Sequence, residues 1–107
     1  MNILSNISRD SEGYLNVMSD WTTEIAIAIA EEDSIILTSD HWVVIHLLRE
    51  FYCKYAISPA IRPLVKSMGE KLGAGKNSSV FLAKLFPKGA AKQANKFSGL
   101  PKPIRCI

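Results

Sequence analysis

Glycine and proline residues divide the second half of the chain into short segments, and this division strongly restricts the fold. Proline is tolerated in the first turn of a helix, and glycine is favoured just after the last turn. Helices of this length are marginal in isolation, so they must pack against one another. The expected helices are 59–72, 80–86 and 90–97, and the residues that bound them are Pro59, Gly73, Pro87, Gly89 and Gly99.

Apolar spacing predicts two further helices in the first half. One of them, from His41 to about Tyr55, follows three polar side chains at 38–40 that can cap its first turn. Its apolar stripe consists of Val44, Leu47, Leu48, Phe51 and Tyr55. Residues 1–20 are polar, and there we expect a short strand or hairpin around Gly13. The earlier helix is marked by a stripe at i, i+4, i+7 and i+8 that consists of Trp21, Ile25, Ala28 and Ile29.

The composition is typical of one globular domain. The chain has 107 residues, of which 48% are apolar and 21% charged, enough for a single modest core. We see no apolar run long enough to span a bilayer and no signal-peptide pattern, so we expect a cytoplasmic protein. We expect one domain over residues 1–98 and a mobile C-terminal arm over residues 99–107.

The net charge of +3 conceals a strong division between the two halves. Residues 1–53 contain nine acidic and two basic residues, whereas residues 54–107 contain one acidic and eleven basic residues. The lysines of the basic half have two interpretations. They are solvated charges that keep the protein in solution, or they form a surface that faces an acidic protein or a nucleic acid. We predict a docking face near the tail that consists of Lys88, Lys92, Lys96 and Lys102.

Cys106, the next-to-last residue, is the leading candidate for a catalytic group. Pro101 and Pro103 keep the tail out of a helix and favour an extended form. The seven residues from Gly99 to Cys106 then reach roughly 22 Å. Positive charge on Lys102 and Arg105 is expected to lower the pKa of the thiol, which favours the nucleophilic thiolate.

Other functional interpretations carry less support. Two cysteines are too few for a disulfide scaffold and lack the spacing of a zinc site, so no metal or cofactor is expected. We interpret Cys53 as a small side chain in a second packing layer. The loop around Gly75-Lys76 lacks the glycine and hydroxyl positions of a phosphate-binding loop. The helices 41–55, 59–72 and 80–86 also resemble a helix-turn-helix array, which leaves a DNA-binding regulator as an alternative.

Two C-terminal stretches resemble the signature of the DsrC/TusE family, namely LFPKGAAKQA at 85–94 and GLPKPIRCI at 99–107. The likeness extends upstream to cover nearly the whole chain beyond about residue 10. The resemblance implies a mostly helical α+β fold, with a small N-terminal β-meander packed on an array of about five helices and a flexible Pro-rich tail.

The same resemblance implies a sulfurtransferase that carries a persulfide on Cys106. The sulfur would come from a TusBCD-like sulfurtransferase complex and pass to an MnmA-like tRNA thiouridylase. That enzyme makes 2-thiouridine at the wobble position, and contact with tRNA would be indirect. The sulfite-reductase branch of the family has a second tail cysteine eleven residues before the penultimate one, where this chain has Asn95. This difference points to the TusE branch, and a sulfite-reductase-associated sulfur carrier is the alternative within the family.

Overall fold

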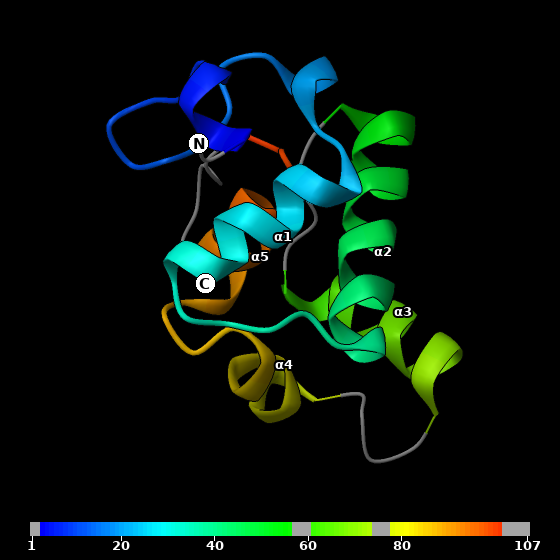
Figure 1. Cartoon of the computed structure of the whole chain (residues 1–107). Coiled ribbons are helices and arrows are strands. Elements are labelled where there is room, and N and C mark those ends of the chain that lie inside the picture. The colour runs from blue at the N-terminus through cyan, green and yellow to red at the C-terminus, as the bar shows by residue number, and fades with distance from the viewer. Residues whose placement is uncertain (1–2, 57–60, 74–77, 102–107) are drawn as a thin grey trace.

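The computed structural model describes residues 3–56, 61–73 and 78–101, with only the backbone of Ile61 and Arg62 (Figure 1). Within these ranges the five predicted helices are confirmed, although the expected helix start at Ser58-Pro59 lies outside them. The described elements are the 3-10 helices η1 (Ile3–Asn6) and η2 (Met18–Asp20) and the α-helices α1 (Thr23–Glu32), α2 (Ser39–Tyr55), α3 (Ile61–Leu72), α4 (Ser79–Leu85) and α5 (Ala90–Phe97).

The predicted N-terminal β-meander is wrong, because the described part of the chain contains no β-strand. The expected hairpin around Gly13 is a tight loop that is closed by a single antiparallel bridge between Arg9 and Leu15. The carboxylate of Asp10 accepts hydrogen bonds of 2.9 Å from the backbone N–H groups of both Glu12 and Tyr14. These side-chain contacts satisfy the turn locally, so the segment stays a loop and does not extend into a ladder.

Side-chain caps account for where the first two α-helices begin. The hydroxyl of Thr22 accepts a hydrogen bond of 3.2 Å from the N–H of Ile25 at the start of α1. At the start of α2, Thr38 and His41 form a reciprocal capping box. Such caps satisfy N–H groups that have no partner inside the helix. The cap at Thr38 confirms the capping residues predicted before α2.

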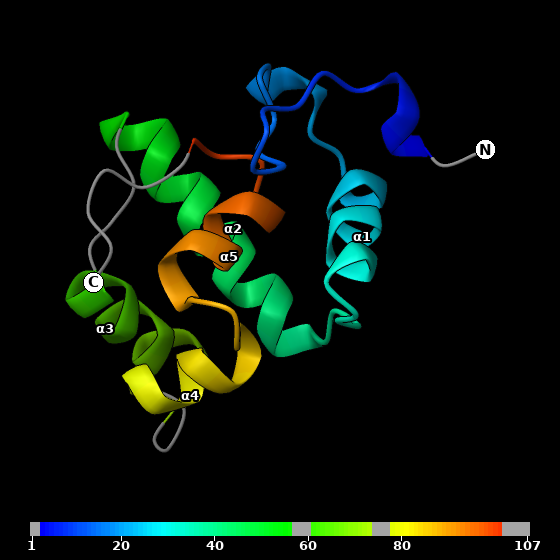
Figure 2. The same ribbon diagram turned by 90° about the vertical axis from the view of Figure 1, so that its left-hand side faces the viewer.

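Helix α5 lies near the middle of the molecule and packs against α1, α2 and α4, whereas α3 packs against α2 and α4 (Figures 1 and 2). Its residues Ala94 and Phe97 are completely buried, and the ring of Phe97 lies 5.8 Å from that of Phe86. The C-terminal segment therefore leaves the domain directly from its core. The largest buried core side chains are Phe86, Phe97, Ile25, Ile29, Ile45, Leu48, Met68, Leu82 and Leu100.

The end of α2 extends beyond the core. Val44 and Leu48 of the predicted apolar stripe are buried, but Tyr55 is 52% exposed, and its ring centroid lies 4.6 Å from that of Phe51. Among the described residues, no helix combines the length and apolar character that crossing a membrane requires.

Candidate functional site at the end of helix α5

A Schellman motif ends α5 and begins the C-terminal segment. The N–H of Gly99 donates to the carbonyl of Lys96 at 3.2 Å, and the N–H of Leu100 donates to the carbonyl of Asn95 at 3.0 Å. The motif needs a left-handed residue after the last turn, and Gly99 supplies it with a φ of +72°. Leu100 is only 1% exposed, so the backbone is anchored up to this residue, and Pro101 is exposed.

Two side chains from other elements bind the carbonyl end of α5. The indole Nε1 of Trp21 donates to the carbonyl of Phe97 at 2.8 Å, and Nη1 of Arg49 donates to the carbonyl of Ser98 at 2.7 Å. The Cζ atom of Arg49 also lies 3.9 Å from the centre of the Trp21 ring. The cation thus stacks on an aromatic face and compensates the negative end of the helix dipole. Burial lowers the pKa of the Arg49 guanidinium, and the nearby Cys53 thiol opposes this shift.

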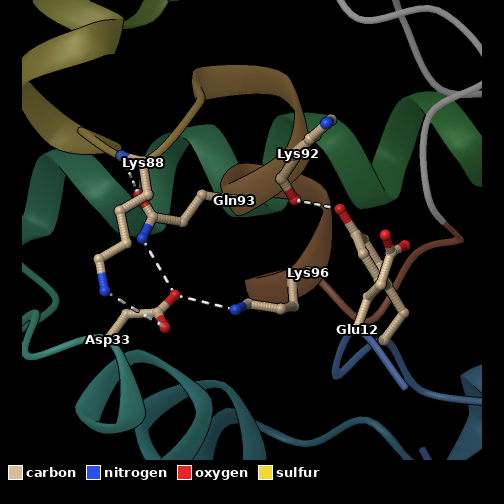
Figure 3. Close-up of a pocket in the computed structure, with 7 residues that line it drawn as sticks. Glu12, Asp33, Lys88, Lys92, Gln93 and Lys96 are labelled. Atoms are coloured by element: carbon tan, nitrogen blue, oxygen red, sulfur yellow. Dashed lines mark hydrogen bonds and ion pairs between the residues drawn. The ribbon is translucent and has the colours of Figure 1, made fainter. Parts of the chain in front are cut away.

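A polar pocket of about 170 Å³ lies beside α5, facing the loop near Glu12 (Figure 3). On one wall of the pocket, the carboxylate of Asp33 contacts three side chains from α5 and the segment before it. Its Oδ2 accepts from Nζ of Lys96 at 2.9 Å and from Nε2 of Gln93 at 3.0 Å. Nζ of Lys88 lies 4.0 Å from Oδ1 of the same carboxylate. Burial opposes ionisation, but the hydrogen bonds from Gln93 and Lys96 outweigh it, so the pKa of Asp33 lies below its usual value.

The structure brings together only part of the predicted docking face. Lys88 and Lys92 are exposed at the pocket, and the backbone carbonyl of Lys92 accepts from the Tyr14 hydroxyl at 3.0 Å. Lys96 is half-buried in an ion pair of 2.9 Å with Asp33, so its charge is compensated more fully than that of Lys88, which is exposed and lies 4.0 Å from the same carboxylate. Pro101 is the last residue that is described. The remaining predicted site residues lie outside the described ranges, namely Lys102, Pro103, Arg105 and Cys106.

The interpretation of Cys53 as a packing residue is wrong, because its side chain is exposed. It lies one helical turn after Arg49 on the part of α2 that extends beyond the core. The sequence indicated no role for Arg49 or Asp33. It placed Trp21 on the apolar stripe of the first helix, but that helix begins only at Thr23. Their positions gave little indication of these contacts, because the hydrogen bonds of Trp21, Arg49 and Asp33 span 76, 49 and 60 residues of sequence.

The fold and this C-terminal anchor define a family. The family model described as "DsrC like protein" matches residues 4–107, so the chain belongs to the DsrC-like family. It is 52% identical over 101 residues to "Sulfurtransferase TusE" of Salmonella choleraesuis, an alignment that covers 94% of this chain and 93% of the relative. The solution structure of DsrC from Allochromatium vinosum is 48% identical, with a TM-score of 0.84 and coverage of 94% and 90%.

A third comparison extends the family to a more distant member. The crystal structure of the oxidized gamma-subunit of the dissimilatory sulfite reductase from Archaeoglobus fulgidus is 35% identical to this chain. Its TM-score is 0.86, and the alignment covers 94% of this chain and 92% of that one. The helical domain is therefore shared with DsrC structures at 48% and 35% identity.

Proposed function

We propose that this protein is a sulfur-relay protein that accepts a persulfide sulfur on Cys106 and passes it to a tRNA thiouridylase. The supporting observation is identity of about half of all residues, over nearly the full length, to relatives named sulfurtransferases. A single penultimate thiol on a proline-containing tail is also the arrangement that such a relay needs. It places a nucleophile where two different partner sites can receive it.

The chemistry requires only a thiolate. Cys106 attacks the terminal sulfur of a donor persulfide, the donor's S–S bond breaks, and the donor cysteine leaves as a thiolate. In the second step, a thiolate of the acceptor attacks the outer sulfur and Cys106 leaves as a thiolate. One sulfane sulfur has moved, no electrons are gained or lost overall, and no metal or cofactor takes part.

The proposed partners are a TusBCD-like donor complex and an MnmA-like acceptor that makes 2-thiouridine at the wobble position of tRNA. Lys92 is exposed on α5, Lys88 is exposed just before this helix, and Lys102 follows it in the sequence. Rim charges of one sign mainly steer the encounter with an oppositely charged partner. We therefore assign these lysines to docking on an acidic surface beside each partner's reactive cysteine.

A sulfite-reductase-associated carrier is the second candidate, and the resemblance to the Archaeoglobus gamma-subunit favours it. Asn95 argues against it, because this position would hold a second cysteine in that branch and here cannot form a tail disulfide.

Intact-mass measurement after incubation with a persulfide donor tests the proposal. The wild-type chain and Cys53→Ser should each gain one sulfur atom that dithiothreitol removes, whereas Cys106→Ser should gain none. The loaded protein should then restore 2-thiouridine synthesis by the thiouridylase. Sulfur loading of Cys106→Ser with activity intact would overturn the assignment.

A further inference from the structure

The carbonyl end of α5 is held by two elements that are distant in the sequence. Trp21 follows η2 and Arg49 lies on α2, yet they bind the consecutive carbonyls of Phe97 and Ser98. The stacking of the guanidinium on the indole joins the two contacts into one unit. We call Trp21 and Arg49 the tail clamp.

Gly99 fits this clamp closely. A Cβ atom added at Gly99 would lie 2.5 Å from Cδ1 of Trp21 and 2.8 Å from its Cβ, which is closer than atoms can approach. The backbone at Gly99 is therefore pressed against the indole. Leu100 follows as a fully buried anchor. The clamp acts just before Pro101, which is exposed and is the last residue that the structure describes.

The residue at which the anchored backbone ends determines the length of chain that connects the Cys106 thiol to the domain. Cys106 lies five residues beyond Pro101 in the sequence, and the extended form that the prolines predict would span roughly 16 Å at about 3.1 Å per residue. Releasing residues 98–100 would lengthen the tether to eight residues and roughly 25 Å. The effective concentration of the thiol at a docked partner's cysteine would then fall roughly two- to fourfold.

We propose that Trp21 and Arg49 are positioning residues that fix where the C-terminal arm starts and the direction in which it leaves the domain. Both residues act through the backbone of α5 and do not contact sulfur. The expected effect on sulfur transfer rests on the proposed relay function. The effect on the arm itself does not, because it can be measured separately.

The first experiment measures the arm directly. A nitroxide is attached to Cys106 in a Cys53→Ser chain, and its broadening of backbone amide signals is recorded by NMR. With the clamp intact, broadening should be confined to amides on one side of the domain. In the double variant Trp21→Phe with Arg49→Ala, which loses both carbonyl contacts, broadening should spread to further elements. An unchanged pattern in a folded double variant would overturn the proposal.

The second experiment separates positioning from reactivity. Sulfur transfer between the double variant and its partner protein should slow two- to fourfold, while loading of Cys106 by a small-molecule persulfide stays unchanged. Arg49→Lys should rescue part of the loss, and Lys84→Ala on the exposed side of α4 serves as the matched control. If the double variant reacted equally slowly with the partner protein and with the small-molecule persulfide, a positioning role would be contradicted. Failure of the unaltered chain to load sulfur would refute the relay function, yet the nitroxide experiment would still test the clamp.

Discussion

The imidazole Nε2 of His41 lies 2.8 Å from the backbone carbonyl of Leu85, and this contact ties the start of α2 to the end of α4. On its other side, Nδ1 accepts a hydrogen bond of 3.1 Å from the N–H of Thr38. An accepting Nδ1 requires the proton of the neutral ring to be on Nε2, which then donates to Leu85. One buried ring thus completes a helix cap and a contact between helices.

We therefore expect His41→Ala to destabilise the domain by about 2–3 kcal/mol, because it removes a buried ring and the partners of two partly buried backbone groups. Urea unfolding measures this loss. His46→Ala, on the same helix, is the matched control and should change the free energy of unfolding by less than about 0.5 kcal/mol. Equal effects of the two substitutions would contradict the role assigned to the His41 ring.

Gly99→Ala should destabilise the domain more than Gly73→Ala. Both glycines have a positive φ, so alanine is strained by about 1–2 kcal/mol at either position. Only at Gly99 would the new Cβ collide with Trp21, since nothing lies within 4 Å at Gly73. We expect an additional loss of about 1–3 kcal/mol at Gly99, as for overpacking of a core. Paired denaturant titrations measure the difference, and equal losses would show that the contact with Trp21 can relax.

Asp33→Asn should weaken the domain mainly above pH 4. Because the pKa of Asp33 is lower in the folded than in the unfolded state, its ionised form contributes stability that is fully present above the ordinary pKa of about 3.9. That contribution is lost as the pH falls through the lower, folded pKa. The variant should lose about 1 kcal/mol at pH 7 and show a flatter decline in acid. Glu31→Gln, exposed on α1, is the control, and an unchanged acid profile of Asp33→Asn would contradict the prediction.

Substitution of the two cysteines should have different effects on sulfur transfer. Cys53 is exposed, so Cys53→Ser should change the free energy of unfolding by no more than about 0.5 kcal/mol and leave sulfur acceptance intact. Cys106→Ser should also keep the thermal midpoint while abolishing transfer. Thermal unfolding followed by circular dichroism, together with the mass assay, gives both quantities. Loss of sulfur loading in Cys53→Ser would assign a role to the second thiol.

Lys92→Glu should slow association with the donor complex, and the slowing should diminish as salt rises. Lys92 is exposed at the pocket, so reversing its charge opposes attraction to an acidic partner. Lys84→Glu, an equal change of net charge on α4, should have a smaller effect on the association rate. Stopped-flow measurements at several salt concentrations test this. Equal slowing by both variants would indicate that only net charge matters.

Much of the helical framework could be predicted from the sequence, because the forces that begin and end these helices are local. The cap at Thr38 and the glycine after α5 act within a few residues of the chain, so they leave a readable pattern. The β-meander was expected from resemblance, and it failed because Asp10 satisfies the backbone of the loop that would have been a hairpin. The likeness to the family itself was evident from the C-terminal motif and is confirmed by the family model.

The candidate site depended on tertiary structure. Arg49 reaches a carbonyl 49 residues away and Trp21 one 76 residues away, so neither contact leaves a spacing pattern in the chain. Helical periodicity likewise grouped Tyr55 with the core, and closeness to the tail in the sequence grouped Lys96 with the docking face. Whether a side chain is buried depends on which face of its helix packs against another element. Whether a lysine charge is compensated depends on whether a carboxylate lies within ion-pair distance. The sequence by itself determined the helices and the terminal thiol, whereas packing alone decided which charges are compensated and where the tail begins.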